Sequence, residues 1–152
     1  MGGKQKIYLL VGCPGSGKTW VCSQLGDAFH IVPHDKRRHN AAIYAREIEN
    51  EMETATKPLI IETPFGVSEI MFELKVKRSY DVVPVFIIEE PGILEERYFK
   101  RSGKQIPQGH LTRQETYRER ARDLGAFTGT SAEVAAMLKS GRVMLADLWG
   151  DR

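Results

Sequence analysis

Residues 12–19 combine glycines, a lysine and a threonine at a spacing that suits the binding of a polyphosphate. The pattern is a glycine, four residues and then Gly-Lys-Thr. Glycines let backbone N–H groups turn toward one anion, and the lysine and threonine can then reach the phosphates and a magnesium ion. We therefore expect ATP and Mg²⁺ here, with Lys18 on the β and γ phosphates and Thr19 on the metal. The predicted nucleotide-binding residues are Gly12, Cys13, Pro14, Gly15, Ser16, Gly17, Lys18 and Thr19.

The neighbouring segments make this pattern specific. An apolar run of strand length, residues 7–11, precedes the loop, and residues 18–25 read as a helix that Gly26 ends. Multiplied residue frequencies give a chance match in about one per cent of chains of this length, before that context is required. The structural alternative is a glycine-rich turn that binds nothing.

Other classes of phosphate-loop protein fit the sequence less well. Recognition of guanine usually brings an Asn-Lys-x-Asp segment, which the sequence lacks. A motor ATPase would show an apolar strand that ends in Asp-Glu. Here Glu89 and Glu90 follow the apolar run but precede Pro91, so they are interpreted as acids that open a helix.

Charged residues also follow the second and third predicted strands. Asp35 is a candidate general base, because a carboxylate can accept the proton of a hydroxyl that attacks the γ phosphorus. Arg37 and Arg38 would bind the acceptor or the transferred group, and Glu62 could orient them or contact the acceptor. The alternatives are an N-cap of the next helix for Asp35 and an ordinary surface acid for Glu62.

Arg97 and Arg101 lie four residues apart on a predicted helix and so share one face. They precede residues 102–109, which contain glycines and a proline and are interpreted as a mobile loop. A lid over about residues 97–112 would bring both guanidinium groups onto the transferring phosphoryl group and exclude water. A solvated basic pair is the alternative.

These side chains must be positioned by a set of alternating strands and helices. Strands are predicted at 7–11, 29–33, 59–61 and 82–88, with a short one at 126–129. Helices are predicted at 18–25, 36–56, around 70–74, 91–100, 112–124 and 130–141. Capping boxes begin the last two, Thr112 with Glu115 in one and Thr130 with Glu133 in the other. The alternation predicts a three-layer α/β fold with a parallel sheet of four to five strands, the lid following the fourth, in a single domain over residues 1–152.

The composition sets broad limits on function. The chain has 152 residues, two cysteines and a formal net charge of +2. No apolar run of membrane-spanning length and no secretory signal is evident, so we expect a soluble cytoplasmic protein with no membrane partner. Basic residues gather at 36–39 and between Arg97 and Arg113, which is compatible either with a nucleic-acid partner or with solvated surfaces.

Several of these segments resemble one family. Gly12 to Trp20, Asp35 with its arginines, Glu62 and residues 97–107 resemble the kinase domain of bacteriophage polynucleotide kinase, over most of residues 6–120. The resemblance implies Lys18 and Thr19 on ATP and magnesium and Asp35 as general base. It also implies Arg38 near the acceptor phosphate with support from Glu62, and Arg101 on the lid.

The sequence departs from that family in two ways. A chain of this length leaves no room for the phosphatase domain of the phage enzyme. Residues 127–134 look instead like the adenine-flanking loop and last helix of adenylate- and thymidylate-type kinases, which implies that Thr128 and Gly129 bind the nucleotide.

A small kinase of this kind resembles the phage enzymes that phosphorylate the hydroxymethyl group of 5-hydroxymethyluracil in DNA, a step in thymidine hypermodification. DNA is then the expected partner, with Lys104 and Arg113 on its phosphates, in the host cytoplasm if the chain is phage-encoded. The alternatives are a 5′-hydroxyl polynucleotide kinase, a nucleotide or other small-molecule kinase, and an ATP-dependent binding module without catalysis. The oligomeric state stays open.

Overall fold

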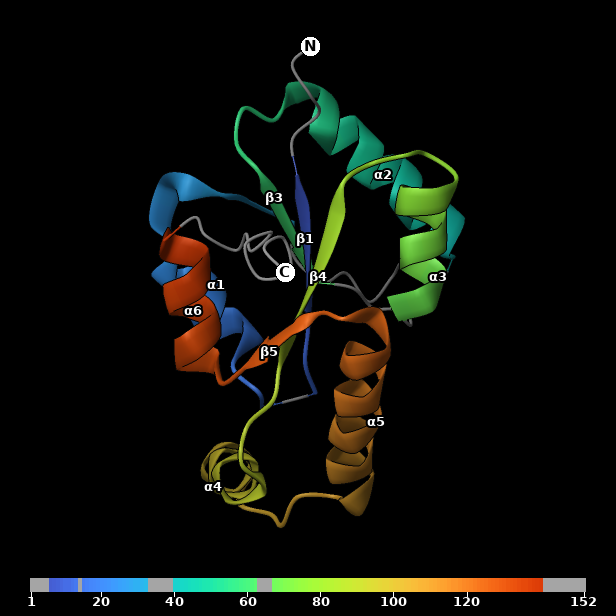
Figure 1. Ribbon diagram of the computed structural model, residues 1–152. Coiled ribbons are helices and arrows are strands. Elements are labelled where there is room, and N and C mark those ends of the chain that lie inside the picture. Colours follow the sequence, from blue (N-terminus) through green and yellow to red (C-terminus); the bar gives the residue numbers. More distant parts are fainter. Residues whose placement is uncertain (1–5, 14, 33–39, 63–66, 141–152) are drawn as a thin grey trace. The chain divides into compact units, whose positions relative to one another are not determined.

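The computed structural model describes residues 6–13, 15–32, 40–62 and 67–140 (Figure 1). The chain divides into two compact units, and each consists of two segments. The first unit comprises Met1–Val11 and Asp27–Val85, and the second comprises Gly12–Gly26 and Phe86–Arg152. The phosphate loop and the predicted lid therefore belong to the same unit.

Three parallel strands form the centre of the first unit. They are β1 (Ile7–Val11), β2 (His30–Val32) and β3 (Leu59–Glu62), and β3 lies between the other two. Ile7 pairs with Leu59 in one ladder and Val32 with Ile61 in the other. All of β1 is buried, as expected for a parallel strand covered on both faces. This burial explains its uninterrupted apolar sequence.

Two helical segments pack beside each other in the first unit. Helix α2 (Ala41–Thr54) lies next to α3 (Val67–Met71), which continues as a π-helical turn, η2 (Phe72–Val76). Their buried side chains are Tyr44, Ala45, Ile48, Ile70 and Leu74. Helix α2 is shorter than the predicted 36–56, because its N-cap is Asn40, whose side chain accepts hydrogen bonds from the N–H groups of residues 42 and 43. The N-cap of this helix is therefore Asn40.

In the second unit, helix α1 (Lys18–Gln24) directly follows the phosphate loop. A 3-10 turn, η1 (Gly26–Ala28), follows it. Helix α1 packs against α6 (Ser131–Ser140), as Figure 1 shows. The predicted capping box at the start of α6 is confirmed, since the N–H of Thr130 donates to Glu133 Oε1 over 2.8 Å and the N–H of Glu133 donates to Thr130 Oγ1 over 3.2 Å.

Helices α4 (Pro91–Ser102) and α5 (Gln108–Leu124) follow the fourth strand. The predicted start of α5 at Thr112 is wrong, because the helix begins at Gln108 with Pro107 at its N-cap. The connection between the helices is correspondingly short, residues 103–107. Its Ile106 is buried against Cys13 and Leu94. The predicted loop therefore contains a residue that anchors it to the phosphate loop.

Strands β4 (Val82–Ile87) and β5 (Phe127–Gly129) complete a sheet with the order β2-β3-β1-β4-β5. The N–H of Ile88 donates to the carbonyl of Gly129 over 2.9 Å, at the end of β4. An α/β fold with a parallel sheet of four to five strands, as predicted, is confirmed. None of the helices in the described ranges is both long and apolar enough to cross a bilayer.

Candidate nucleotide-binding site

The backbone of the phosphate loop takes a conformation that favours glycine. Gly15 has φ +85° and Gly17 has φ +107°, in the left-handed region that L side chains rarely adopt. The N–H of Ser16, between them, donates to the carbonyl of Cys13 over 3.0 Å. A Cβ added at Gly17 would lie 2.8 Å from Ser131 Cβ, and one at Gly12 would lie 2.3 Å from Ser16 Oγ. Conformation and space thus explain the glycines of the motif.

Cys13 fixes the loop to the hydrophobic core of the second unit. Its side chain is buried with Leu94 and Ile106, and Tyr98 packs against the same cluster. Burial raises the pKa of the Cys13 thiol, although the charges of Lys18 and Arg113 act to lower it. The thiol therefore stays protonated at neutral pH and acts as a small apolar side chain.

Lys18 and Thr19 are the first residues of α1 and so lie at the N-terminus of that helix. The Lys18 ammonium donates to the carbonyl of Gly12 over 2.5 Å, so its charge lies beside the first residue of the loop. The first turn of α1 contains no acidic residue. The partial positive charge of the helix N-terminus is therefore available to an anion.

A pocket of about 610 Å³ lies over the loop, within the size range of sites for nucleotides and other small ligands. Its polar lining includes Lys18, Thr19 and two arginines. An aromatic side chain, Trp20, and Ala132 of α6 also contribute, and Trp20 is exposed. The lining residues are Cys13, Gly15, Gly17, Lys18, Thr19, Trp20, Arg97, Arg101, Ser131 and Ala132. A polyphosphate and a nucleoside fit the chemistry of this lining.

The two arginines of α4 line the pocket in different ways. Arg97 Nη1 donates to the carbonyls of Gly15 and Ser16 over 3.1 and 3.0 Å, so this guanidinium holds the loop. Arg101 is exposed, its guanidinium carbon lies 5.7 Å from the centre of the Tyr98 ring, and its Nη2 lies 4.0 Å from the position of a Cβ on Gly15. Arg101 thus lies close to the loop at the exposed side of the pocket, whereas Arg97 bonds to the loop backbone.

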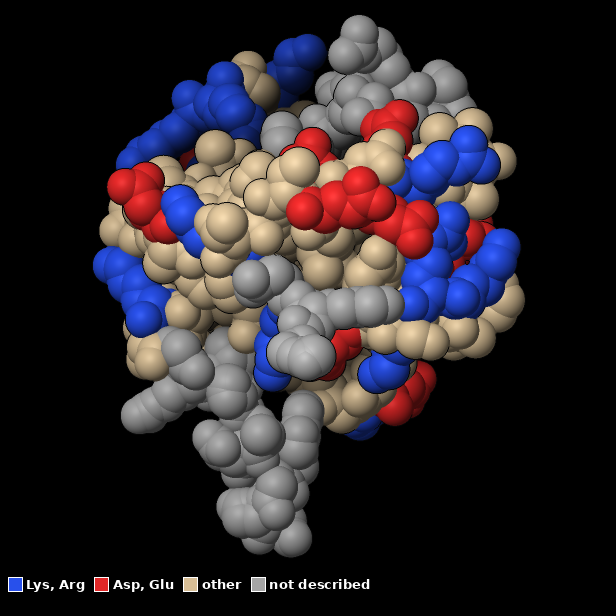
Figure 2. Space-filling view, turned by 90° about the horizontal axis from the view of Figure 1, so that it is seen from above, with Lys and Arg blue, Asp and Glu red and all other residues tan. Residues whose placement is uncertain are grey.

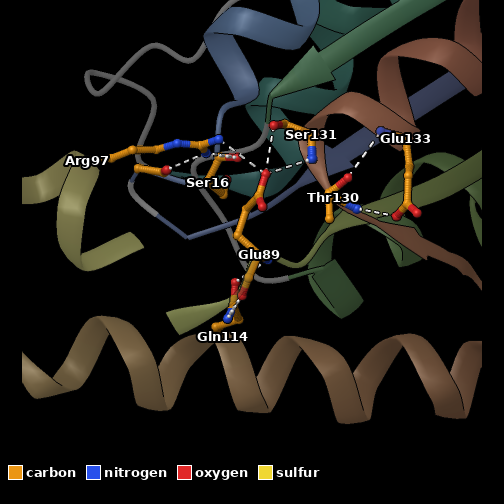
Figure 3. A network of polar contacts seen from close by, with 8 residues as sticks. Ser16, Glu89, Arg97, Gln114, Thr130, Ser131 and Glu133 are labelled. Atoms are coloured by element: carbon orange, nitrogen blue, oxygen red, sulfur yellow. Dashed lines mark hydrogen bonds and ion pairs between the residues drawn. The ribbon is translucent and has the colours of Figure 1, made fainter. Parts of the chain in front are cut away.

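A buried glutamate that the sequence analysis did not select lies beside this site (Figure 3). Glu89 is only 6% exposed. Its Oε2 accepts from the N–H and the hydroxyl of Ser131, over 2.9 and 2.7 Å, and from Arg97 Nη2 over 3.4 Å. Gln114 holds the backbone of Glu89, since its side-chain amide accepts from the N–H over 3.0 Å and donates to the carbonyl over 2.8 Å. The neighbouring Glu90 occupies the N-cap of α4 and is exposed, so only that acid fits the helix-opening interpretation.

Several predicted site residues lie outside the described residues or in the first unit. Pro14, Asp35, Arg37 and Arg38 are outside the described ranges. Glu62 ends β3 in the first unit, where its carbonyl accepts from the Tyr44 hydroxyl over 2.9 Å. The roles proposed for these residues stay predictions.

The remaining predicted residues belong to the second unit. Thr128 and Gly129 lie in β5, whereas the pocket lining includes Ser131 and Ala132, directly after it. Lys104 and Arg113 are exposed, in the connection between α4 and α5 and on α5. Within the described ranges, His, Cys, Asp and Glu side chains form no group of three that could hold a metal ion.

The sequence matches no protein-family model, and it matches no curated protein. Solved structures, in contrast, share its fold. A gluconokinase from Sinorhizobium meliloti 1021 matches with a TM-score of 0.64 at 17% identity, over 97% of both chains. The Deinococcus radiodurans tunicamycin resistance protein matches with a TM-score of 0.62 at 16% identity, over 93% of this chain and 97% of that one.

Shikimate kinase from Acinetobacter baumannii, solved in complex with shikimate, matches with a TM-score of 0.52 at 16% identity, over 98% of this chain and 95% of the other. Identities this low show a common fold and no more. The chain therefore has the α/β fold of these structures, two of which are named as kinases.

Proposed function

We propose that the chain is an ATP-dependent phosphotransferase that transfers the γ-phosphate to a hydroxyl group. The observation that carries this proposal is the pocket over the phosphate loop, where Lys18, Thr19 and two arginines line one cavity at the N-terminus of α1. Such a site stabilises a polyphosphate and the charge that develops on a transferring phosphoryl group. The fold shared with two proteins named as kinases supports the same proposal.

Each residue has a defined role in the proposed transfer. The loop N–H groups and Lys18 would bind the β and γ phosphates, and Thr19 would hold Mg²⁺, which would supply positive charge against those phosphates. Arg101 would neutralise the γ-phosphoryl group as the lid closes. Asp35 would accept the proton of the attacking hydroxyl. The hydroxyl oxygen forms a bond to the γ phosphorus as the bond to the bridging oxygen breaks, and ADP leaves.

The acceptor that we propose is the hydroxymethyl group of 5-hydroxymethyluracil in DNA. The resemblance to phage kinases supports it, as do the exposed Lys104 and Arg113 of the unit that carries the pocket. Figure 2 shows Lys and Arg beside Asp and Glu on the face that it presents. Because the net charge is only +2, DNA binding would depend on a local cluster of basic residues. The base would have to leave the stack or the duplex would have to bend, because the hydroxymethyl group lies in the major groove.

A hydroxyl of a small molecule is the second candidate acceptor. The observation that favours it is the shared fold with a gluconokinase and with a shikimate kinase solved in complex with shikimate. The third candidate acceptor is the 5′-hydroxyl end of a polynucleotide, which the resemblance to polynucleotide kinase supports.

The experiment is phosphate transfer from γ-labelled ATP to a panel of acceptors. The panel contains duplex DNA with 5-hydroxymethyluracil, the same DNA with thymine, 5′-hydroxyl oligonucleotides, free nucleotides, gluconate and shikimate. Label on an internal modified base, located by digestion, is the expected result. Label only on a 5′ end or only on a small molecule would reject the DNA-base acceptor and retain the kinase.

A further inference from the structure

Glu89 holds together three parts of the nucleotide pocket through one carboxylate oxygen. Its Oε2 accepts from Arg97 on α4 and from the backbone and hydroxyl of Ser131 at the start of α6. Arg97 in turn donates to the carbonyls of Gly15 and Ser16. Figure 3 shows these contacts as one continuous network from the loop to α6.

The surroundings of Glu89 make this arrangement rigid. The side chains of Glu89 and Ser131 are buried, and Gln114 of α5 fixes the backbone of Glu89 on both its N–H and its carbonyl. A buried carboxylate is costly unless its hydrogen bonds and a positive partner are present. Here the guanidinium of Arg97 and two donors from Ser131 supply both.

The network acts on the part of the loop that must bind phosphate. Arg97 binds the carbonyls of Gly15 and Ser16 and so restrains the backbone of this stretch, directly before α1, where a phosphate would bind. Ser131 packs so closely on Gly17 that a Cβ there would lie 2.8 Å from Ser131 Cβ. The carboxylate thus fixes both neighbours of the loop.

We propose that Glu89 is a positioning residue, which keeps the phosphate loop in its anion-binding conformation through Arg97 and Ser131. Arg97 then belongs to the positioning network, and Arg101 is left as the arginine of the lid. This inference rests on the proposed nucleotide site, but its first consequence concerns the loop itself and not the nucleotide.

The test compares Glu89→Gln with Glu90→Gln, which removes the same charge from the adjacent, exposed residue. Hydrogen exchange of peptides covering residues 12–19 is measured in the nucleotide-free proteins, and ATP affinity is measured by calorimetry with and without Mg²⁺. We expect Glu89→Gln to speed exchange of the loop severalfold and to weaken ATP binding about tenfold, as for the loss of a charged hydrogen bond. Glu90→Gln should match the wild type in both measurements.

A double-mutant cycle separates positioning from general destabilisation. Because part of the effect of Glu89 passes through Arg97, the loss of ATP affinity in Glu89→Gln/Arg97→Met should be smaller than the sum of the losses in the two single variants. Should Glu89→Gln fail to fold, Ser131→Ala removes one donor to the carboxylate and should speed loop exchange by a smaller factor.

Two sets of results would overturn the inference. Loop exchange equal to wild type in Glu89→Gln, or additive effects in the double-mutant cycle, would exclude positioning through Arg97. A loss of ATP affinity confined to samples with Mg²⁺, with normal loop exchange, would make Glu89 part of the metal site. If the wild type binds no ATP while the exchange result holds, the proposed function fails and the positioning role stands.

Discussion

Gly17 is constrained in two ways: its φ is +107°, and a Cβ added there would lie only 2.8 Å from Ser131 Cβ. We expect Gly17→Ala to destabilise the protein by about 1–3 kcal/mol and to weaken ATP binding more than tenfold. Urea unfolding and calorimetric titration check both effects. Gly92→Ala is the control, because its Cβ would meet nothing within 4 Å and its φ is not in the left-handed region. Equal effects of the two substitutions would contradict this account of the loop.

Trp20 provides a direct optical test of the pocket. The chain contains two tryptophans: Trp20 lines the pocket, and Trp149 lies outside the described residues. In a Trp149→Phe protein, the remaining indole should change its fluorescence when ATP binds, since a nucleoside would bury part of an exposed aromatic side chain. Saturating ATP, confirmed by calorimetry, without any change in emission would place the nucleoside elsewhere.

The residues of the site differ in how readily the sequence reveals them. The phosphate loop is a contiguous pattern, and its glycines, Lys18 and Thr19 could be selected directly. Glu89 could not, because its partner Ser131 lies 42 positions further along the chain and Gln114 lies 25 positions away. The available signal was its place after a fully apolar strand, at the carboxyl end where ligands of α/β sheets collect. The adjacent Pro91 made a helix-opening role the simpler interpretation.

Elements were predicted well where local chemistry determines them. Strand β1 and helix α6 follow from an apolar run and a capping box. The start of α5 was missed because Thr112 and Glu115 also satisfy the capping-box pattern, although both lie inside the helix. What sets the true start is the connection at Ile106 and Pro107, and the burial of Ile106 against Cys13 is a tertiary contact that sequence spacing does not report.

The two capping patterns allow a matched test at the scale of the helix. Thr130→Ala should cost about 0.5–2 kcal/mol, because it removes the hydroxyl that accepts from the N–H of Glu133. Thr112→Ala should change stability by about 0.5 kcal/mol or less, since Thr112 is exposed and lies in the interior of α5, where alanine is a good helix former. Chemical unfolding measures both. A loss of unfolding free energy that is larger for Thr112→Ala than for Thr130→Ala would contradict the observed start of α5.

At the scale of the whole molecule, the net charge of +2 is too small to bind DNA without a local cluster. We expect Lys104→Gln/Arg113→Gln to weaken binding of DNA and to reduce the salt slope of that binding by about 2, because each phosphate contact contributes about 0.9. ATP affinity should stay unchanged. Lys57→Gln, an exposed lysine of the other unit, is the control. Equal loss of ATP binding in the double variant would reject these residues as a DNA surface.

A nucleotide-binding module could have the same pocket without transferring a phosphoryl group from ATP to a hydroxyl. The most direct measurement is single-turnover transfer from γ-labelled ATP to 5-hydroxymethyluracil DNA, with ATP affinity measured on the same samples of wild type and Asp35→Asn. We expect the wild type to label the DNA, and Asp35→Asn to bind ATP with similar affinity while transferring no label. A wild type that binds ATP but labels neither this DNA nor any other acceptor would contradict the account, as would transfer by Asp35→Asn at the wild-type rate.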